Sequence, residues 1–135
     1  MCRLLLVTFL LFLSGCATTD SFYSGEIKSP DELATIVSKY TPVITVAGHL
    51  KLNLVDGEHP RSLWNWSAYR WEVLPGKRDF TFQVNIPGKV GVKSVVFTVE
   101  AGKMYYASPV IDYKNMSFDV DIKEVSPDFF EPEKS

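Results

Sequence analysis

Four segments of this chain alternate apolar and polar side chains one by one, and this alternation restricts the fold more than any other feature of the sequence. Side chains of a β-strand point to opposite faces in turn, so a period of two gives each segment one buried and one solvated face. The alternating segments are 50–54, 80–86, 95–99 and 118–122. Shorter strands are expected at 43–47, 69–74 and 104–108.

Turn residues separate these segments at roughly ten-residue spacing. They are Asp56-Gly57, Pro75-Gly76, Pro87-Gly88 and Ala101-Gly102. The last of them, with Lys103, is expected to close a tight hairpin between the strands on either side. About seven strands in roughly 85 residues predict a mainly β fold, an antiparallel β-sandwich.

One segment before the strands is predicted to be an amphipathic helix. Ser29, Pro30 and Glu32 supply an N-cap, a proline at the first helical position and the acidic partner of a capping box. The apolar residues that follow are spaced as on one helix face: Leu33, Ile36, Val37 and Tyr40. Thr41-Pro42 is expected to end a helix of about three turns.

The first sixteen residues indicate export. Arg3 and the apolar run 4–13 are typical of a secretory signal, and the run is too short to be read as a transmembrane helix. Ser14-Gly15-Cys16 resembles a bacterial lipobox, in which the cysteine is acylated and becomes the first residue after cleavage. An uncleaved anchor, or a signal in which Cys16 is incidental, is the alternative.

The resulting organisation is one domain behind a lipid anchor. Residues 1–15 form the lipoprotein signal peptide, 16–28 the lipidated cysteine and tether, 29–125 the helix and sandwich, and 126–135 a tail. In the tether, Phe22, Tyr23 and Ile27 are candidates for packing on the edge of the domain. About 120 mature residues suit a single core.

Charge and cysteine content narrow the possible partners. The net charge is −2, which becomes about −3 when Arg3 leaves with the signal, so no basic surface for nucleic acid is expected. Cys2 leaves with the signal and Cys16 carries the lipid, so no disulfide is expected. The expected contact with the membrane is therefore the N-terminal lipid, and the domain must be stabilised by packing alone.

Few residues suggest catalysis or metal binding. His49 and His59 lack the flanking motifs of a zinc site. Asp112, Asp119 and Asp121 could in principle surround a cation, but their spacing is not that of a calcium loop. The sequence also lacks the common serine-hydrolase and phosphate-loop motifs. No cofactor, metal site or enzymatic activity is expected.

One aromatic cluster is a candidate binding rim. It contains all three tryptophans of the chain within eight residues, and its members are Trp64, Trp66, Tyr69, Arg70 and Trp71. Exposed tryptophan and tyrosine faces stack on sugar rings or peptide side chains. The alternative is that the alternation of a strand buries part of the cluster in the core.

Three segments resemble a known group of proteins in their order along the chain. They are Leu54-Val55-Asp56-Gly57, Leu74-Pro75-Gly76-Lys77-Arg78 and the run 97–106. This order is similar to that of small proteobacterial lipoproteins with a PEGA-like or transthyretin-like domain. Arg78 stands where that pattern usually has histidine. The resemblance implies an Ig/transthyretin-like sandwich of about seven strands and an envelope location, and it implies no catalytic residues.

The function expected from the sequence is that of a lipid-anchored, non-catalytic binding module of the cell envelope, with a protein or glycan ligand. The alternative is a structural accessory in the assembly of an envelope complex. An exposed tryptophan cluster favours the binding module, whereas an uncovered edge strand favours assembly by strand addition. Ala17 after the cysteine, by similarity to sorted lipoproteins, points to the outer membrane, facing the periplasm.

The anchor can be tested directly. Cys16→Ser removes the sulfur that would be acylated, so the variant is expected to accumulate as an uncleaved precursor. Immunoblotting of the membrane and soluble fractions measures this. Normal processing of the variant to a soluble periplasmic form would contradict lipidation at Cys16.

Overall fold

The alternating segments form strands in the computed structural model, which describes residues 19–39, 49–61, 68–86 and 88–129. Six strands follow the predicted order: β3 (Leu50–Val55), β4 (Arg70–Val73), β5 (Gly76–Ile86), β6 (Lys89–Val99), β7 (Met104–Asp112) and β8 (Ser117–Val125). Two further strands precede them, β1 (Thr19–Ser21) and β2 (Ala34–Val37). The strand expected at 43–47 lies outside the described residues.

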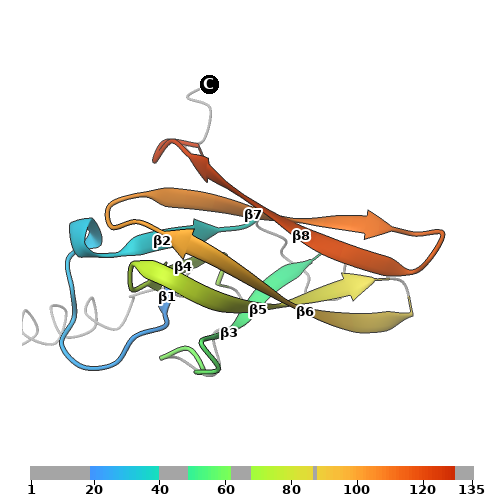
Figure 1. The fold of residues 1–135 in the computed structure, drawn as a ribbon, viewed down its shortest axis with the longest axis horizontal. Coiled ribbons are helices and arrows are strands. Elements are labelled where there is room, and N and C mark those ends of the chain that lie inside the picture. Colours follow the sequence, from blue (N-terminus) through green and yellow to red (C-terminus); the bar gives the residue numbers. More distant parts are fainter. Residues whose placement is uncertain (1–18, 40–48, 62–67, 87, 130–135) are drawn as a thin grey trace, which may run out of the picture.

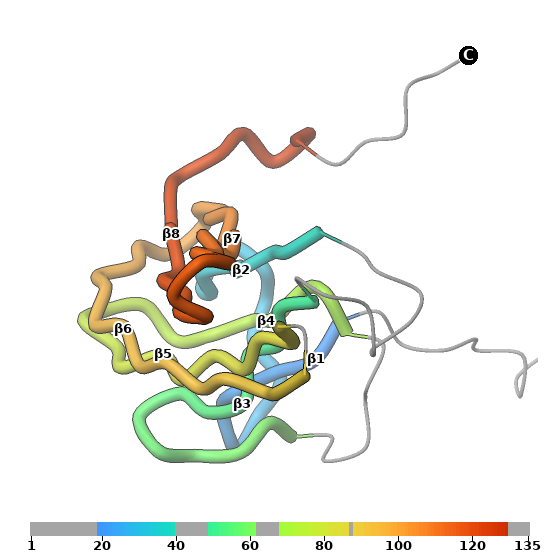
Figure 2. The backbone as a smooth tube through the Cα atoms, turned by 90° about the vertical axis from the view of Figure 1, so that its right-hand side faces the viewer, coloured from blue at the N-terminus to red at the C-terminus, as the bar shows by residue number. Residues whose placement is uncertain are grey.

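The strands make two sheets that pack on one another (Figure 1). The larger sheet has the order β1-β4-β2-β7-β8, and the smaller has the order β3-β5-β6. Seen along its length, the molecule has β8 and β6 on one side of the two layers and β1 and β3 on the other (Figure 2). These are called the β6/β8 side and the β1/β3 side below.

The core lies between the two sheets and follows from the alternation. Phe80, Phe82 and Val84 of β5 are completely buried, while the residues between them are partly exposed. The opposite sheet contributes Ile36, Trp71, Val73, Tyr105 and Ala107, among others, to the same cluster. A mainly β fold with two sheets around one core is therefore confirmed, with eight strands described instead of about seven.

The predicted N-terminal helix is wrong. The helix-start signals produce only one 3₁₀ turn, η1 (Pro30–Glu32), in which the Ser29 N–H donates to the Glu32 carboxylate at 3.0 Å. The chain then becomes extended, and Ala34–Val37 form β2 in the middle of the larger sheet. Three β-branched residues in succession, Thr35 to Val37, favour a strand over a helix.

The expectation of purely antiparallel pairing is also wrong, because two pairings are parallel. β1 lies parallel to β4, and β2 lies parallel to β7. The turn at Ala101-Gly102 is present, and Gly102 has φ +78°. It does not close a hairpin, because β6 pairs with β5 while β7 pairs with β2 and β8. The Thr35 N–H donates to the Lys103 carbonyl at 3.0 Å, which leads β7 into the larger sheet.

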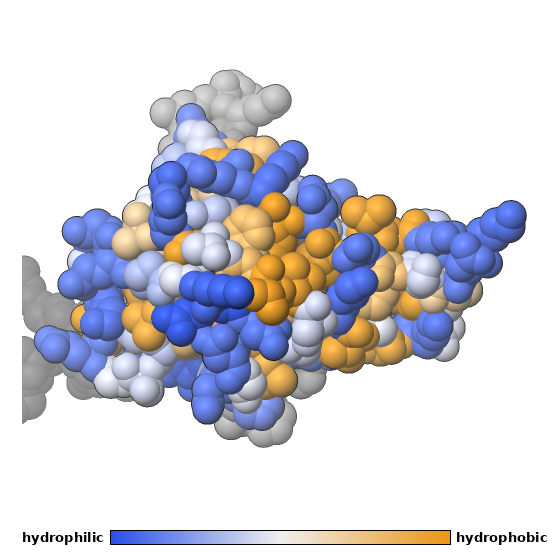
Figure 3. Space-filling model, viewed as in Figure 1, coloured by the Kyte–Doolittle hydropathy of each residue, from blue (hydrophilic) through white to orange (hydrophobic). Residues whose placement is uncertain are grey.

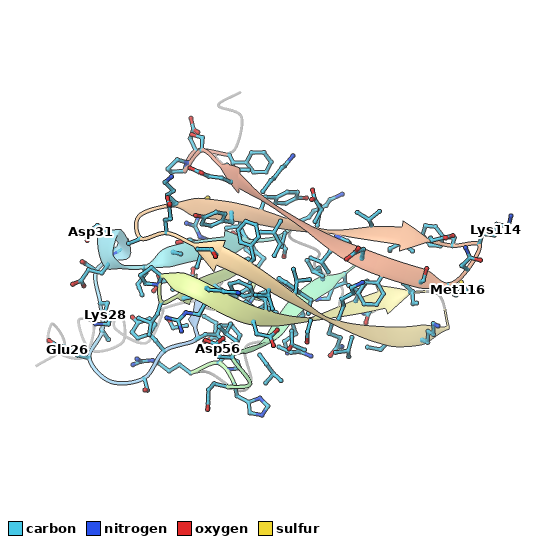
Figure 4. All side chains as sticks on the ribbon, viewed as in Figure 1. Glu26, Lys28, Asp31, Asp56, Lys114 and Met116 are labelled. Carbon is cyan, nitrogen blue, oxygen red and sulfur yellow. The ribbon has the colours of Figure 1, made fainter. Side chains whose placement is uncertain are left out.

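The segment expected to be a tether contributes to the domain. β1 adds an edge strand, and both Phe22 and Tyr23 are buried at its end, whereas Ile27 is 80% exposed. The loop that follows, with Glu26 and Lys28, lies at the same end of the molecule as η1. The β7–β8 turn, with Lys114 and Met116, lies at the opposite end (Figure 4).

The assignment of β2 as a central strand gives a stability prediction. Ile36→Ala removes a completely buried side chain and is expected to lower the free energy of unfolding by about 2–5 kcal/mol. Thr35→Ala on the same strand is the matched control, expected to cost less than about 1 kcal/mol. Urea denaturation of both variants measures the difference, and equal small losses would place Ile36 outside the core.

Candidate functional site

One member of the predicted aromatic rim lies in the core. Trp71 is only 1% exposed and belongs to the core cluster, so it is a core residue and not part of a rim. Tyr69 and Arg70 are half-buried, and Trp64 and Trp66 lie outside the described residues, as does Cys16.

The burial of Trp71 follows from its place on β4. This strand alternates between half-buried and buried residues, and Trp71 and Val73 are the buried pair. In the antiparallel register, Trp71 lies opposite Ile36 of β2, which is also buried. Burial by alternation, the alternative weighed for this cluster, therefore applies to Trp71.

A pocket of about 720 Å³ lies at the β1/β3 side of the molecule. Three segments line it: residues 22–25 after β1, the end of β3 with its following turn to Arg61, and the β4–β5 connection with Arg78. Its apolar lining includes Phe22, Val55 and Leu74. This pocket was not predicted, because its three walls are far apart in the sequence.

Arg61 holds one wall of the pocket in place. Its Nη2 donates to the carbonyl oxygens of Tyr23, at 3.0 Å, and Gly25, at 3.2 Å. The guanidinium lies 4.9 Å from the centroid of the Tyr23 ring, a cation–π distance. The backbone N–H of Arg61 also donates to the Ser21 carbonyl at 2.7 Å, which joins this wall to β1.

Arg78 holds a second wall. Its Nε and Nη2 donate to the carbonyls of Leu74 and Pro75 at 3.1 and 2.9 Å, and its Nη1 contacts Asp56 Oδ2 at 3.0 Å. Asp56 and Gly57 both have positive φ, as a two-residue type I′ turn requires. Hydrogen bonds from the Asp79 backbone N–H and from Arg78 lower the pKa of Asp56 below its usual value.

The two arginines of the pocket are both engaged by the domain itself. Both guanidinium groups are tied to backbone carbonyls, so they shape the walls more than they offer free charge. Glu58 and His59 also line the pocket. Among the described residues, no group of three or more His, Cys, Asp and Glu is placed to hold a metal ion.

Two of the three aspartates considered as cation ligands, Asp112 and Asp119, have other contacts. Asp112 accepts hydrogen bonds from the backbone of Lys114 and Asn115 and from the Asn115 side chain, at 2.7–3.1 Å, so it caps the β7–β8 turn. These bonds lower its pKa. Asp119 forms an ion pair with Lys93 of β6 at 3.4 Å. The two histidines have different surroundings. His49 is half-buried, and desolvation lowers its pKa, whereas His59 lies at the pocket.

A second surface lies on the β6/β8 side, along β6. Alternate residues of β6 share the outer face of the smaller sheet, as the 3.0 Å contact between Ser94 Oγ and Thr81 Oγ1 of β5 shows. Three of these outer residues are exposed valines, Val90, Val92 and Val96, at 57%, 64% and 58%. Figure 3 shows apolar surface on this side of the molecule.

The edge of β6 is open within the described part of the chain. Of the strands described, β6 pairs with β5 alone, so every second residue directs its backbone N–H and C=O away from that ladder. The outer residues of β6 are uncharged: Val90, Val92, Ser94, Val96 and Thr98. Both charges of β6, Lys89 and Lys93, lie outside this row, so an edge of this length presents an uncharged, valine-rich outer face to a pairing chain.

The edge strand of the larger sheet on the same side of the molecule, β8, is different. The exposed row of β8 carries three charges, and its members are Ser117, Asp119, Asp121 and Lys123. Charges on an edge strand oppose pairing with further strands. Where the two edges approach, the Phe118 ring lies so close to Gly91 that a Cβ there would meet it at 2.2 Å. Of the two edges on the β6/β8 side, β6 is therefore the one suited to strand addition.

Comparison of the chain with protein-family models, with curated proteins and with solved structures finds no match. Within the described ranges, the structure has no helix that is both long enough and apolar enough to span a membrane.

The Asp56–Arg78 contact predicts a pH dependence of stability. Because the pKa of Asp56 is lowered in the folded state, its charge stabilises the protein above the unfolded pKa, about 3.9, and this contribution is lost as the pH falls through the folded pKa. Asp56→Asn keeps the turn but removes the charge. Since both side chains are partly exposed, the loss near neutral pH is expected to be below about 1 kcal/mol.

The measurement is the melting temperature of wild type and variant between about pH 7 and pH 2. The difference should shrink toward zero at the acid end. Asp79→Asn is the matched control, because it removes a neighbouring carboxylate and leaves Asp56 and Arg78 in place. A difference for Asp56→Asn that stays constant with pH would contradict the role of its charge.

Proposed function

We propose that this chain is a lipid-anchored protein of the cell envelope that binds a protein partner by strand addition and performs no catalysis. The observation that carries the proposal is the open edge of β6, with its exposed valines and uncharged outer face. In strand addition, backbone hydrogen bonds supply affinity and the side chains beside the edge supply specificity.

The anchor and the location rest on the sequence. The apolar run 4–13 and Ser14-Gly15-Cys16 support acylation at Cys16, and Ala17 supports the outer membrane as the destination. The similarity to small PEGA-like or transthyretin-like lipoproteins is part of the same proposal. The two-sheet architecture agrees with such a domain in its coarse outline, since it is mainly β with two sheets.

Of the two functions considered from the sequence, the assembly role is favoured over a binding module that uses the tryptophan rim for a protein or glycan ligand. That module depended on an exposed tryptophan cluster, and Trp71 is in the core. Assembly by strand addition depended on an uncovered edge strand, and β6 has that character among the described strands. The partner that fits this edge is therefore an extended, uncharged protein strand.

Site-specific photo-crosslinking in the native envelope tests this proposal. A photoreactive amino acid in place of Ser94, which is exposed beside the open edge, is expected to give an adduct of discrete mass. The same replacement of Ser117, an exposed serine on the charged edge of β8, is the matched control.

Val92→Lys tests whether the adduct depends on the valine row. It introduces a charge beside the edge and is expected to reduce the Ser94 adduct about tenfold or more. Equal adducts from positions 94 and 117, or an adduct that Val92→Lys leaves unchanged, would overturn strand addition at β6.

A further inference from the structure

We infer that the strand added to β6 is the β6 strand of a second copy of this chain. This inference rests on the proposed function, because it names the partner for the same edge. It is carried by the self-complementary order of side chains along β6, which fits an antiparallel pair of identical strands related by a two-fold axis.

The two-fold axis passes between Ser94 of one copy and Ser94 of the other. β6 runs from Lys89 to Val99, so Ser94 is its middle residue, and an antiparallel pair centred there matches all eleven residues of one copy with all eleven of the other. In this register Val92 lies opposite Val96 of the second copy, and Val96 lies opposite the second copy's Val92. Two valines on each edge thus find β-branched partners directly across the new ladder.

The remaining pairs contain no like-charge contact. Val90 lies opposite Thr98 of the second copy, and Ser94 lies opposite its own equivalent, where two hydroxyls can hydrogen-bond. The charged residues of β6 are Lys89 and Lys93, which lie opposite Val99 and Val95 of the second copy. A pair centred on Lys93 instead would place lysine directly opposite lysine, which is destabilising.

Lys93, the lysine nearest the two-fold axis, forms an ion pair with Asp119 of its own copy. Lys93 points away from the valine row, since its cross-strand partner on β5 is the buried Phe82. Its ammonium lies 3.4 Å from Asp119 of β8. The second copy therefore meets an uncharged outer face. On the inner face the two Lys93 side chains lie diagonally across the axis, each with Asp119 of its own copy as counter-charge.

The assembly that results is a continuous sheet. The three strands β3-β5-β6 of one copy continue into β6-β5-β3 of the other, and the open edge disappears from both. A symmetric contact of this kind closes on itself, so it gives a dimer and not a filament. Confinement of two lipid-anchored copies to one membrane surface raises their effective concentration for pairing.

A disulfide across the axis provides the test in the full-length chain. Ser94→Cys places one thiol from each copy in directly opposed positions, where the Cα separation of paired strands falls within the range of a disulfide. After mild oxidation of envelope membranes, the variant is expected to run at twice the mass of the chain without reductant. The chain without the added cysteine and Ser117→Cys are the controls, and both should run as monomers.

Two double variants in the Ser94→Cys background test the register. Val92→Lys with Val96→Lys sets lysine opposite lysine across the pair and should reduce the cross-linked species about tenfold or more. Val92→Lys with Val96→Glu changes the same two positions but sets opposite charges across the pair, so cross-linking should return. Equal cross-linking of the two double variants would overturn the register.

The outcomes separate this inference from the proposed function. A valine-dependent photo-adduct at Ser94 whose mass is not twice that of the chain, together with no Ser94→Cys dimer, overturns the second copy as partner and leaves strand addition standing. Absence of both the photo-adduct and the disulfide overturns both. Unchanged melting temperatures of the double variants exclude unfolding as the cause of any loss.

Discussion

The inward row of β5 is the constraint on which the rest of this structure depends. Phe80, Phe82, Val84 and Ile86 are each at most 4% exposed, and burial of one such side chain contributes about 1.5–3 kcal/mol. β5 is the middle strand of a three-stranded sheet, so its inner face must be covered by the other layer. Trp71, Ile36 and Tyr105 of the larger sheet supply part of that cover. This contact between the two layers holds the domain together.

The alternation of apolar and polar residues made the strands from Leu50 onward predictable, because such a strand has one solvent-facing and one buried face. It could not reveal β2, whose burial pattern is nearly continuous: Ala34, Ile36 and Val37 are all buried at the centre of the larger sheet. A short apolar run of this kind has no period of its own. The helix-start signals at Ser29-Pro30 did produce a helical turn, but only one. The β-branched residues 35–37 that follow favour an extended strand over a longer helix.

The candidate sites were less predictable than the fold, since both arise from contacts between distant segments. The pocket needs Arg61 and Arg78 to be brought against the backbone of residues 22–25 and 74–75. The edge character of β6 depends on the chain leaving for the other sheet after Ala101-Gly102, where sequence alone suggested a hairpin. The valines at 90, 92 and 96 were a visible signal, but a sequence does not tell which strand of a sheet lies at its edge.

The parallel pairing of β1 with β4 has a mechanical consequence for a chain attached at Cys16. Thr19 follows that residue by three positions, a span of at most about 10 Å. If the anchor proposed at Cys16 is pulled along the axis of β1, the load falls on the bonds between β1 and β4 together, in shear. The segment next in line is the pocket wall 22–25, which Arg61 fastens to the body of the domain. Loss of the β1–β4 bonds would leave this wall held mainly by Arg61, so the proposed anchor and the pocket are mechanically linked through residues 19–25.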